Sequence, residues 1–81
     1  MPRVSGQADI DGALKRLGEV VRAARKAQAM SQEALADASG IERSHMGKIE
    51  RGERNVTVLN LLRIARATNS SLADFMRSAE L

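Results

Sequence analysis

The sequence lacks several of the residue types on which small folds and active sites depend. It has no cysteine, one histidine (His45) and a single aromatic residue, Phe75. The absence of cysteine excludes disulfides, a thiol nucleophile and a cysteine-based zinc site. A lone histidine excludes a multi-histidine metal site, and no apolar run approaches the roughly 20 residues of a membrane-spanning helix. We therefore expect no metal, no cofactor and no membrane partner.

Length and composition favour one small helical domain. The chain has 81 residues, of which 43% are hydrophobic and 28% charged. Aromatic and β-branched residues, which favour strands, are outnumbered by Ala, Leu, Arg and Glu, which favour helices. A chain this short buries only about 60% of its unfolded surface, so a partner subunit would add stability. The N-terminus has no apolar segment of the kind found in signal peptides, so a cytoplasmic location is expected.

Apolar spacing and capping residues predict an all-α fold, a compact five-helix bundle over residues 11–81. Residues 1–10 lack periodicity and are predicted to form a flexible arm. The helices are expected at about 11–28, 32–39, 42–51, 57–67 and from 71 onward. Their predicted N-terminal caps are Asp11, Ser31, Thr57 and Ser71.

Glycines and one capping motif refine these boundaries. Gly40 is predicted to end the second helix in the left-handed conformation, and Ser71 with Asp74 fits a Ser-x-x-Asp capping pattern. Gly47 is expected on the outward face of helix 42–51, where it costs about 1 kcal/mol relative to alanine. A glycine in that place invites a functional explanation, such as close approach to a ligand.

The helices 32–39 and 42–51 have the dimensions of a helix-turn-helix. They are short and are joined by a tight turn at Gly40. One α-helix is about as wide as the major groove of B-DNA, so a projecting helix can reach base edges. The net charge is +3, and ten of the 13 basic residues are arginine, whose planar fork matches phosphate and guanine. The pattern therefore favours DNA binding, with a solvated basic surface as the plainer interpretation.

Residues 17–66 resemble the Xre-type helix-turn-helix regulators, which include Cro and the phage repressors. The resemblance rests on motifs in a fixed order, and the stretch 50–56 is particularly similar to restriction–modification controller proteins. These motifs are Ser31-Gln32-Glu33, Leu35-Ala36, Gly40-Ile41, Ile49-Glu50-Arg51-Gly52 and Ile64-Ala65. The resemblance implies a lambda-repressor-like DNA-binding domain, with its helix-turn-helix at about 32–51 and helix 42–51 as the recognition helix.

The resemblance also implies roles for individual residues. It places Arg43, Ser44 and Lys48 toward base edges and Gln32 against a phosphate. It pairs one arginine of the first helix with a glutamate at the end of the recognition helix. Here these residues are Arg25 and Glu50, and such a pair locks the structure without touching DNA, since breaking a buried pair costs about 3–5 kcal/mol.

Further polar residues near the recognition helix are candidates for contact with the DNA backbone. They are His45, Arg51, Arg54, Asn55 and, on the first helix, Arg22. For each of them, exposure to solvent without a DNA contact is the alternative interpretation.

The last helix carries more apolar residues than a terminal helix needs. Leu72, Phe75 and Met76 either close the core over the first and fourth helices or form a two-fold dimer interface, and the resemblance implies a homodimer. In such a dimer the recognition helices lie about 34 Å apart, which predicts a pseudo-palindromic operator.

We therefore predict a sequence-specific double-stranded-DNA-binding transcriptional regulator that acts as a homodimer. An enzyme is not expected, because the chain lacks Cys, Tyr, a glycine-rich phosphate loop and a paired-carboxylate site. The alternative is an antitoxin or protein-interaction module whose DNA binding depends on a partner protein. RNA binding is disfavoured by the lack of aromatic residues that stack on bases. No small-molecule ligand is expected, and RNA polymerase is a partner only if the protein activates transcription.

Overall fold

The computed structural model describes residues 9–81, so the predicted arm lies largely outside the described residues. A 3-10 turn, η2 (Ile10–Gly12), leads into α1, and no strand occurs between residues 9 and 81. The helices are α1 (Ala13–Ala27), α2 (Gln32–Ser39), α3 (Arg43–Glu50), α4 (Val58–Ala67) and α5 (Leu72–Ser78). The predicted all-α, five-helix fold is confirmed. The helix boundaries lie within two residues of those expected, except that α5 ends at Ser78 and does not extend to Leu81.

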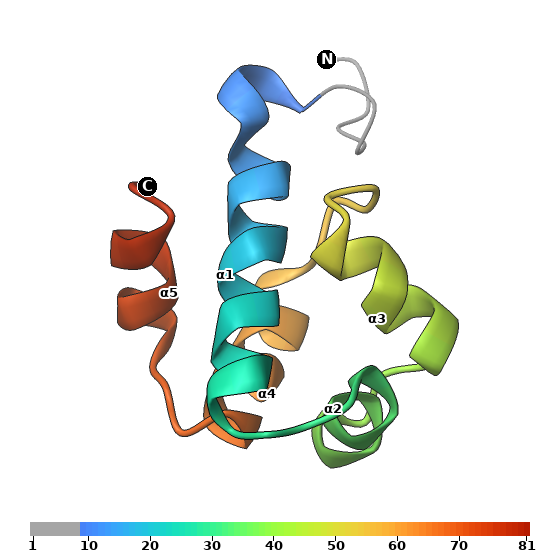
Figure 1. Ribbon diagram of the computed structural model, residues 1–81. Helices are drawn as coiled ribbons and strands as arrows, with labels where there is room; N and C mark the ends of the chain where they lie inside the picture. The colour runs from blue at the N-terminus through green and yellow to red at the C-terminus, as the bar shows by residue number, and fades with distance from the viewer. Residues whose placement is uncertain (1–8) are drawn as a thin grey trace.

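The longest helix, α1, runs through the middle of the molecule (Figure 1). It packs against α3 on one side and α5 on the other, and α4 lies behind it (Figure 1). The α2 helix packs against both α3 and α4. Together, α2 and α3 form the helix-turn-helix unit. This arrangement places α3 at one edge of the molecule and α5 at the opposite edge.

The hydrophobic core draws on all five helices. Phe75, the one aromatic residue, is among the largest fully buried side chains, together with Leu35, Met46, Ile64 and Val21. Phe75 brings α5 into the same core as the helix-turn-helix. Because Phe75 is buried, this residue of α5 closes the core.

Three of the predicted caps are present. The hydroxyls of Ser31, Thr57 and Ser71 accept hydrogen bonds from the backbone N–H three residues later, at 3.0, 3.1 and 3.0 Å. The Ser71–Asp74 capping box is complete, and its hydrogen bonds from Ser71 lower the pKa of the Asp74 carboxyl. Gly40 caps α2 with φ 70°, in the left-handed conformation expected of it.

The predicted cap of the first helix is wrong. Asp11 lies within the 3-10 turn with φ 59° and does not cap α1. The carboxylate of Asp9 takes this role, because it accepts from the backbone N–H groups of Leu14 and Lys15 at 2.8 and 3.2 Å. The extra turn moves the start of α1 beyond Asp11, which local sequence pattern alone does not reveal.

Two glycines allow α1 to approach the end of α3. A Cβ atom on Gly18 would lie 2.5 Å from the carbonyl oxygens of Ile49 and Glu50. Gly52 has φ +72°, and a Cβ there would lie 2.7 Å from the Cα of Lys15. Backbone therefore packs directly on backbone, and this contact sets the position of α3 relative to α1.

We expect Gly18→Ala to lower the free energy of unfolding by about 1–3 kcal/mol, because the clash outweighs the gain in helix propensity. Urea titration followed by circular dichroism measures this change. Gly47→Ala is the matched control, since a Cβ there meets first the flexible end of Arg51, at 3.1 Å. Equal stability of the Gly18 variant and the native chain would show that α1 tolerates displacement from α3.

Candidate DNA interface

The helix-turn-helix consists of α2, the turn at residues 40–42 and α3. The backbone N–H of Ile41 donates to the carbonyl of Ala36 at 2.9 Å, and the Ile41 side chain is buried. On α3, Met46 and Ile49 face the core. The opposite side of α3 is open to solvent, with exposed Arg43 and Ser44 and half-buried His45 and Lys48.

A buried polar network connects the end of α3 to α1 and α2. The Glu50 carboxylate, with a side chain only 2% exposed, accepts from Arg25 Nε at 2.7 Å and from Arg25 Nη2 at 3.0 Å. The same carboxylate accepts from Gln32 Nε2 at 3.1 Å, and Arg25 Nη1 donates to the carbonyl of Met30 at 2.9 Å. One carboxylate therefore links α1, the start of α2 and the end of α3.

Gly47 does not lie on the open face of α3 as expected. It is buried, and the Gln32 side chain and the guanidinium of Arg51 lie over it. A Cβ at this position would come within 3.6 Å of Gln32 Oε1. Gly47 therefore makes room for neighbouring side chains of the protein, a tertiary contact that helical periodicity does not indicate.

Arg43 forms an exposed ion pair at the start of α3. Its Nη2 lies 3.0 Å from Glu33 Oε1, and the two side chains are 66% and 55% exposed. Glu33 lies in the first turn of α2, so the ion pair spans the N-terminal ends of both helices of the motif. Glu33 lies directly beside Gln32 in the chain, but sequence pattern alone does not indicate that it contacts Arg43.

The remaining candidates for backbone contact surround α3. Arg51, Arg54 and Asn55 are exposed at the end of α3 and in the following loop, and Arg22 is exposed on α1. Arg51 Nε lies 2.6 Å from Glu53 Oε2. This hydrogen bond lowers the pKa of Glu53 and raises that of Arg51, so both groups are charged at neutral pH.

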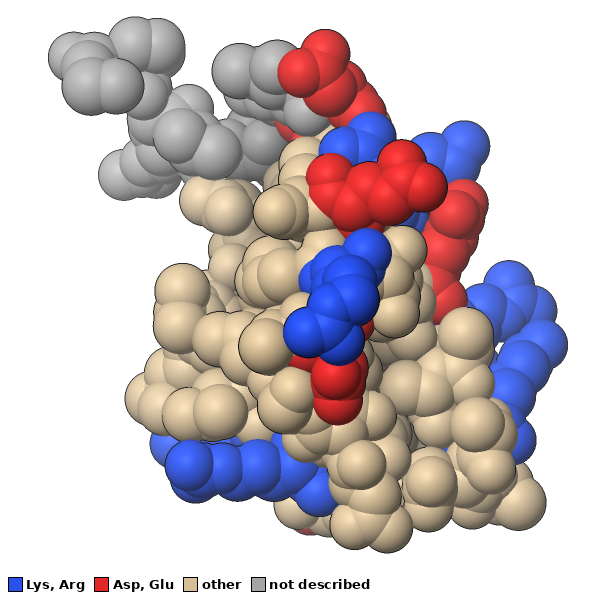
Figure 2. Space-filling view, turned by 90° about the vertical axis from the view of Figure 1, so that its left-hand side faces the viewer, with Lys and Arg blue, Asp and Glu red and all other residues tan. Residues whose placement is uncertain are grey.

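The predicted dimer residues on α5 do not share one environment. Phe75 is 2% exposed within a single chain, so its assignment to a dimer interface is corrected to the core. Leu72 and Met76 are half-buried and partly open to solvent. Figure 2, which views the molecule from the α5 side, shows broad uncharged areas around a narrow strip of charged side chains.

Two apolar side chains at the start of α4 are open to solvent. Val58 is 67% exposed, and Leu59 beside it is 56% exposed. Leu81 is also exposed, beyond the end of α5.

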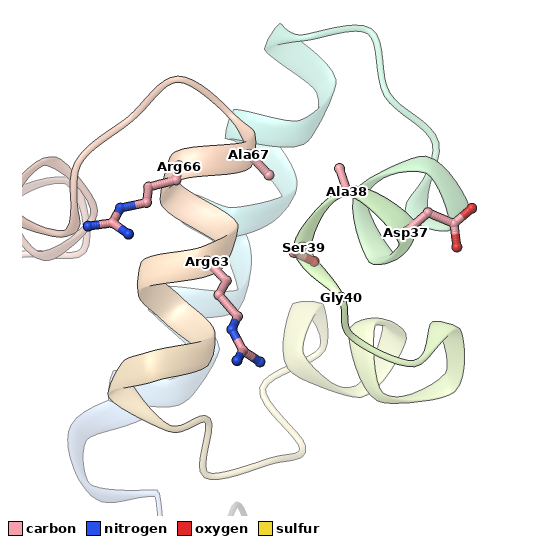
Figure 3. Close-up of a pocket in the computed structure, with 7 residues that line it drawn as sticks. All are labelled: Asp37, Ala38, Ser39, Gly40, Arg63, Arg66 and Ala67. Carbon is pink, nitrogen blue, oxygen red and sulfur yellow. The ribbon is translucent and has the colours of Figure 1, made fainter.

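An open groove of about 690 Å³ separates the end of α2 from α4 (Figure 3). Arg63 points toward the turn at Gly40, whereas Arg66 and Asp37 point away from the groove. Between residues 9 and 81 no cluster of acidic or histidine side chains is suited to hold a metal ion. No helix in this part of the chain is long and apolar enough to cross a membrane.

Comparison with known proteins agrees with this geometry. Residues 21–75, which include all of α2, α3 and α4, match a family model described as helix-turn-helix. The chain belongs to the helix-turn-helix family. It is a DNA-binding regulator of transcription of the Xre type, as the motifs around Gln32 and Glu50 indicated.

Relatives of this helix-turn-helix regulator include restriction–modification controllers. Control protein C.SmaI from Serratia marcescens is 46% identical over 56 residues, which cover 69% of this chain and 67% of the relative. The crystal structure of the controller C.AhdI from Aeromonas hydrophila has a TM-score of 0.74 and 40% identity, and the match covers 76% of this chain and 94% of that one. The clp gene regulator ClgR from Corynebacterium glutamicum has a TM-score of 0.81 and 26% identity, over 84% of this chain and 87% of that one.

We expect Glu50→Ala to lower the free energy of unfolding by about 3–5 kcal/mol, because it leaves the Arg25 guanidinium largely buried without its carboxylate. Thermal and urea unfolding measure the loss. The double variant Arg25→Met/Glu50→Leu leaves no unpaired buried charge, so it should be more stable than Glu50→Ala. A double variant less stable than Glu50→Ala would contradict this account.

Proposed function

We propose that this helix-turn-helix regulator binds a specific double-stranded DNA site as a homodimer, with α3 as its recognition helix. The observation that carries the proposal is the network around Glu50. It anchors the buried side of α3 to α1 and α2 while the polar side of α3 stays open to solvent. A helix held in this way can enter the major groove without becoming ordered on binding.

Base contacts are proposed for Arg43, Ser44 and Lys48. Arg43 and Ser44 begin α3 and are exposed, which suits them because the N-terminal residues of a recognition helix contact base edges. Lys48 lies one turn further along and is half-buried. The arginine fork can donate two hydrogen bonds to guanine O6 and N7, the commonest specific contact in the major groove.

Contacts with the DNA backbone are proposed for residues on α3, on the segments that follow and precede it, and on α1. Gln32 begins α2, where free backbone N–H groups favour a phosphate, and its side chain is oriented by Glu50. Phosphate contacts of this kind set register and orientation but carry no sequence information. The other proposed contacts are His45, Arg51, Arg54, Asn55 and Arg22.

The homodimer is proposed to form through the outer surface of α5. Leu72 and Met76 offer partly open apolar side chains there, and exposed Leu81 follows them in the chain. Two-fold symmetry would present two copies of α3 to successive major grooves, about 34 Å apart. We further propose that the operator is pseudo-palindromic and that the regulated genes, as the names of the relatives indicate for those proteins, belong to a restriction–modification system.

The deciding experiment selects bound sites from a randomised duplex pool at about 150 mM salt, where non-specific binding is weak. Enrichment of a two-fold symmetric motif is the expected result. Folded protein that enriches no motif would favour the alternative, an antitoxin or interaction module that binds DNA only with a partner protein.

Arg43→Ala and Arg54→Ala should separate base reading from backbone contact. Arg43→Ala is expected to relax preference at one base position by about tenfold, because it removes a bidentate contact. Arg54→Ala is expected to weaken binding to all sequences. It should also reduce the slope of the logarithm of the binding constant against the logarithm of salt concentration by about one. Fluorescence anisotropy at several salt concentrations measures both, with exposed Arg66→Ala on α4 as the control. Identical effects of the two variants on every sequence would contradict these assignments.

Met76→Glu should abolish the dimer, since Met76 is partly open to solvent and a charge on an apolar interface lacks a partner. Circular dichroism melting verifies that the variant remains folded, because Met76 also packs against the core. Sedimentation equilibrium measures the subunit mass, and a paired-site duplex should lose more affinity than a half-site. Leu59→Glu is the matched control on the exposed start of α4. Loss of the dimer in the Leu59 variant alone would move the interface to α4.

A further inference from the structure

Glu33 lies where an acidic side chain is unexpected in a DNA-binding surface. It is half exposed in the first turn of α2, beside the proposed phosphate contact Gln32, and its carboxylate lies 3.0 Å from the guanidinium of Arg43. Facing the phosphate backbone, a carboxylate opposes binding to every sequence. Because the pair is exposed, it adds little to stability. Stability alone therefore gives a weak explanation for an acid at this position.

The chemistry of the ion pair matches two kinds of group on base edges. In the major groove, guanine presents two acceptors, O6 and N7, whereas cytosine and adenine present amino donors, at N4 and N6. The Arg43 guanidinium offers donors for guanine, and the adjacent carboxylate of Glu33 offers an acceptor for an amino group. Donor and acceptor lie side by side, because the ion pair joins the starts of α2 and α3.

We propose that Glu33 is a specificity-determining residue, which orients the Arg43 fork and requires a base amino group next to the guanine that Arg43 contacts. A thymine O4 or a second guanine O6 at that position would face the carboxylate with an acceptor and be rejected. This inference rests on the proposed function, in which α3 enters the major groove. Through Glu33, α2 then takes part in recognising the DNA bases together with α3.

The test compares the sites selected by the native chain and by E33Q at the same salt concentration. A glutamine amide both donates and accepts, so E33Q should lower the preference at and beside the Arg43 position by about tenfold, the scale of one good base contact. Affinity for non-specific DNA should stay the same or rise, because one negative charge is removed. E33A is the second variant, and circular dichroism melting verifies that both variants remain folded.

Glu42→Gln is the matched control. Glu42 is an exposed acid that immediately precedes Arg43, its side chain makes no capping hydrogen bond, and it forms no ion pair with residues 9–81. Its removal should tighten binding to all sequences alike. In an Arg43→Ala background, E33Q should have no remaining effect on the preference for guanine.

Unchanged base preferences in E33Q and E33A, with a uniform change in affinity, would overturn the inference and leave Glu33 a general electrostatic group. That result differs from failure of the proposed function, in which the native chain itself enriches no site. Relaxed preference in Glu42→Gln equal to that in E33Q would also overturn it, because the effect would then come from charge near α3 and not from the ion pair.

Discussion

The placement of α3, the proposed recognition helix, depends on the carboxylate of Glu50. A carboxylate buried to this degree is costly unless its charge is paired and its oxygens accept hydrogen bonds. Arg25 and Gln32 satisfy it from two different helices, at 2.7 to 3.1 Å. The directionality of these bonds specifies where α3 lies relative to α1 and α2, which apolar packing alone would define less strictly. The side chains proposed to contact DNA take their positions from this arrangement.

Close backbone packing makes this network possible in a small chain. Gly18 allows the carbonyl groups at the end of α3 to approach α1, and the left-handed conformation of Gly52 turns the chain away beside Lys15. With one aromatic residue available, the core is completed by Phe75, which joins α5 to the other helices. Because Phe75 is buried in the core, it is not exposed to a partner chain. Only neighbouring residues of α5 remain partly open on its surface.

Apart from the Arg25–Glu50 pair, which the family resemblance implied, the features that could be predicted from the sequence are those that depend on nearby residues. Ser31, Thr57 and Ser71 cap helices through bonds to residues three positions away, and Gly40 ends α2 through its own φ angle. The errors arose where distant segments meet. Gly47, for example, is covered by Gln32 from another helix. The ion pair between Glu33 and Arg43 was missed for the same reason, since only the fold brings these two residues together. By contrast, the wrongly predicted cap of α1 has a local cause, because a 3-10 turn gives the capping role of Asp11 to Asp9.

The distribution of charge around α3 bears on how such a small regulator can be selective. Arg43 and Arg51, two arginines proposed to contact DNA, are each paired with an acid, Glu33 and Glu53. An unpaired guanidinium would strengthen binding to any phosphate backbone and so favour the many non-specific sites of a genome. A paired guanidinium must exchange or share its carboxylate on binding. For Arg43, the proposed base contact, this energy is regained only where the bases offer a matching set of acceptors and donors. The modest net charge of +3 is consistent with a surface that limits non-specific attraction and relies on base contacts for affinity.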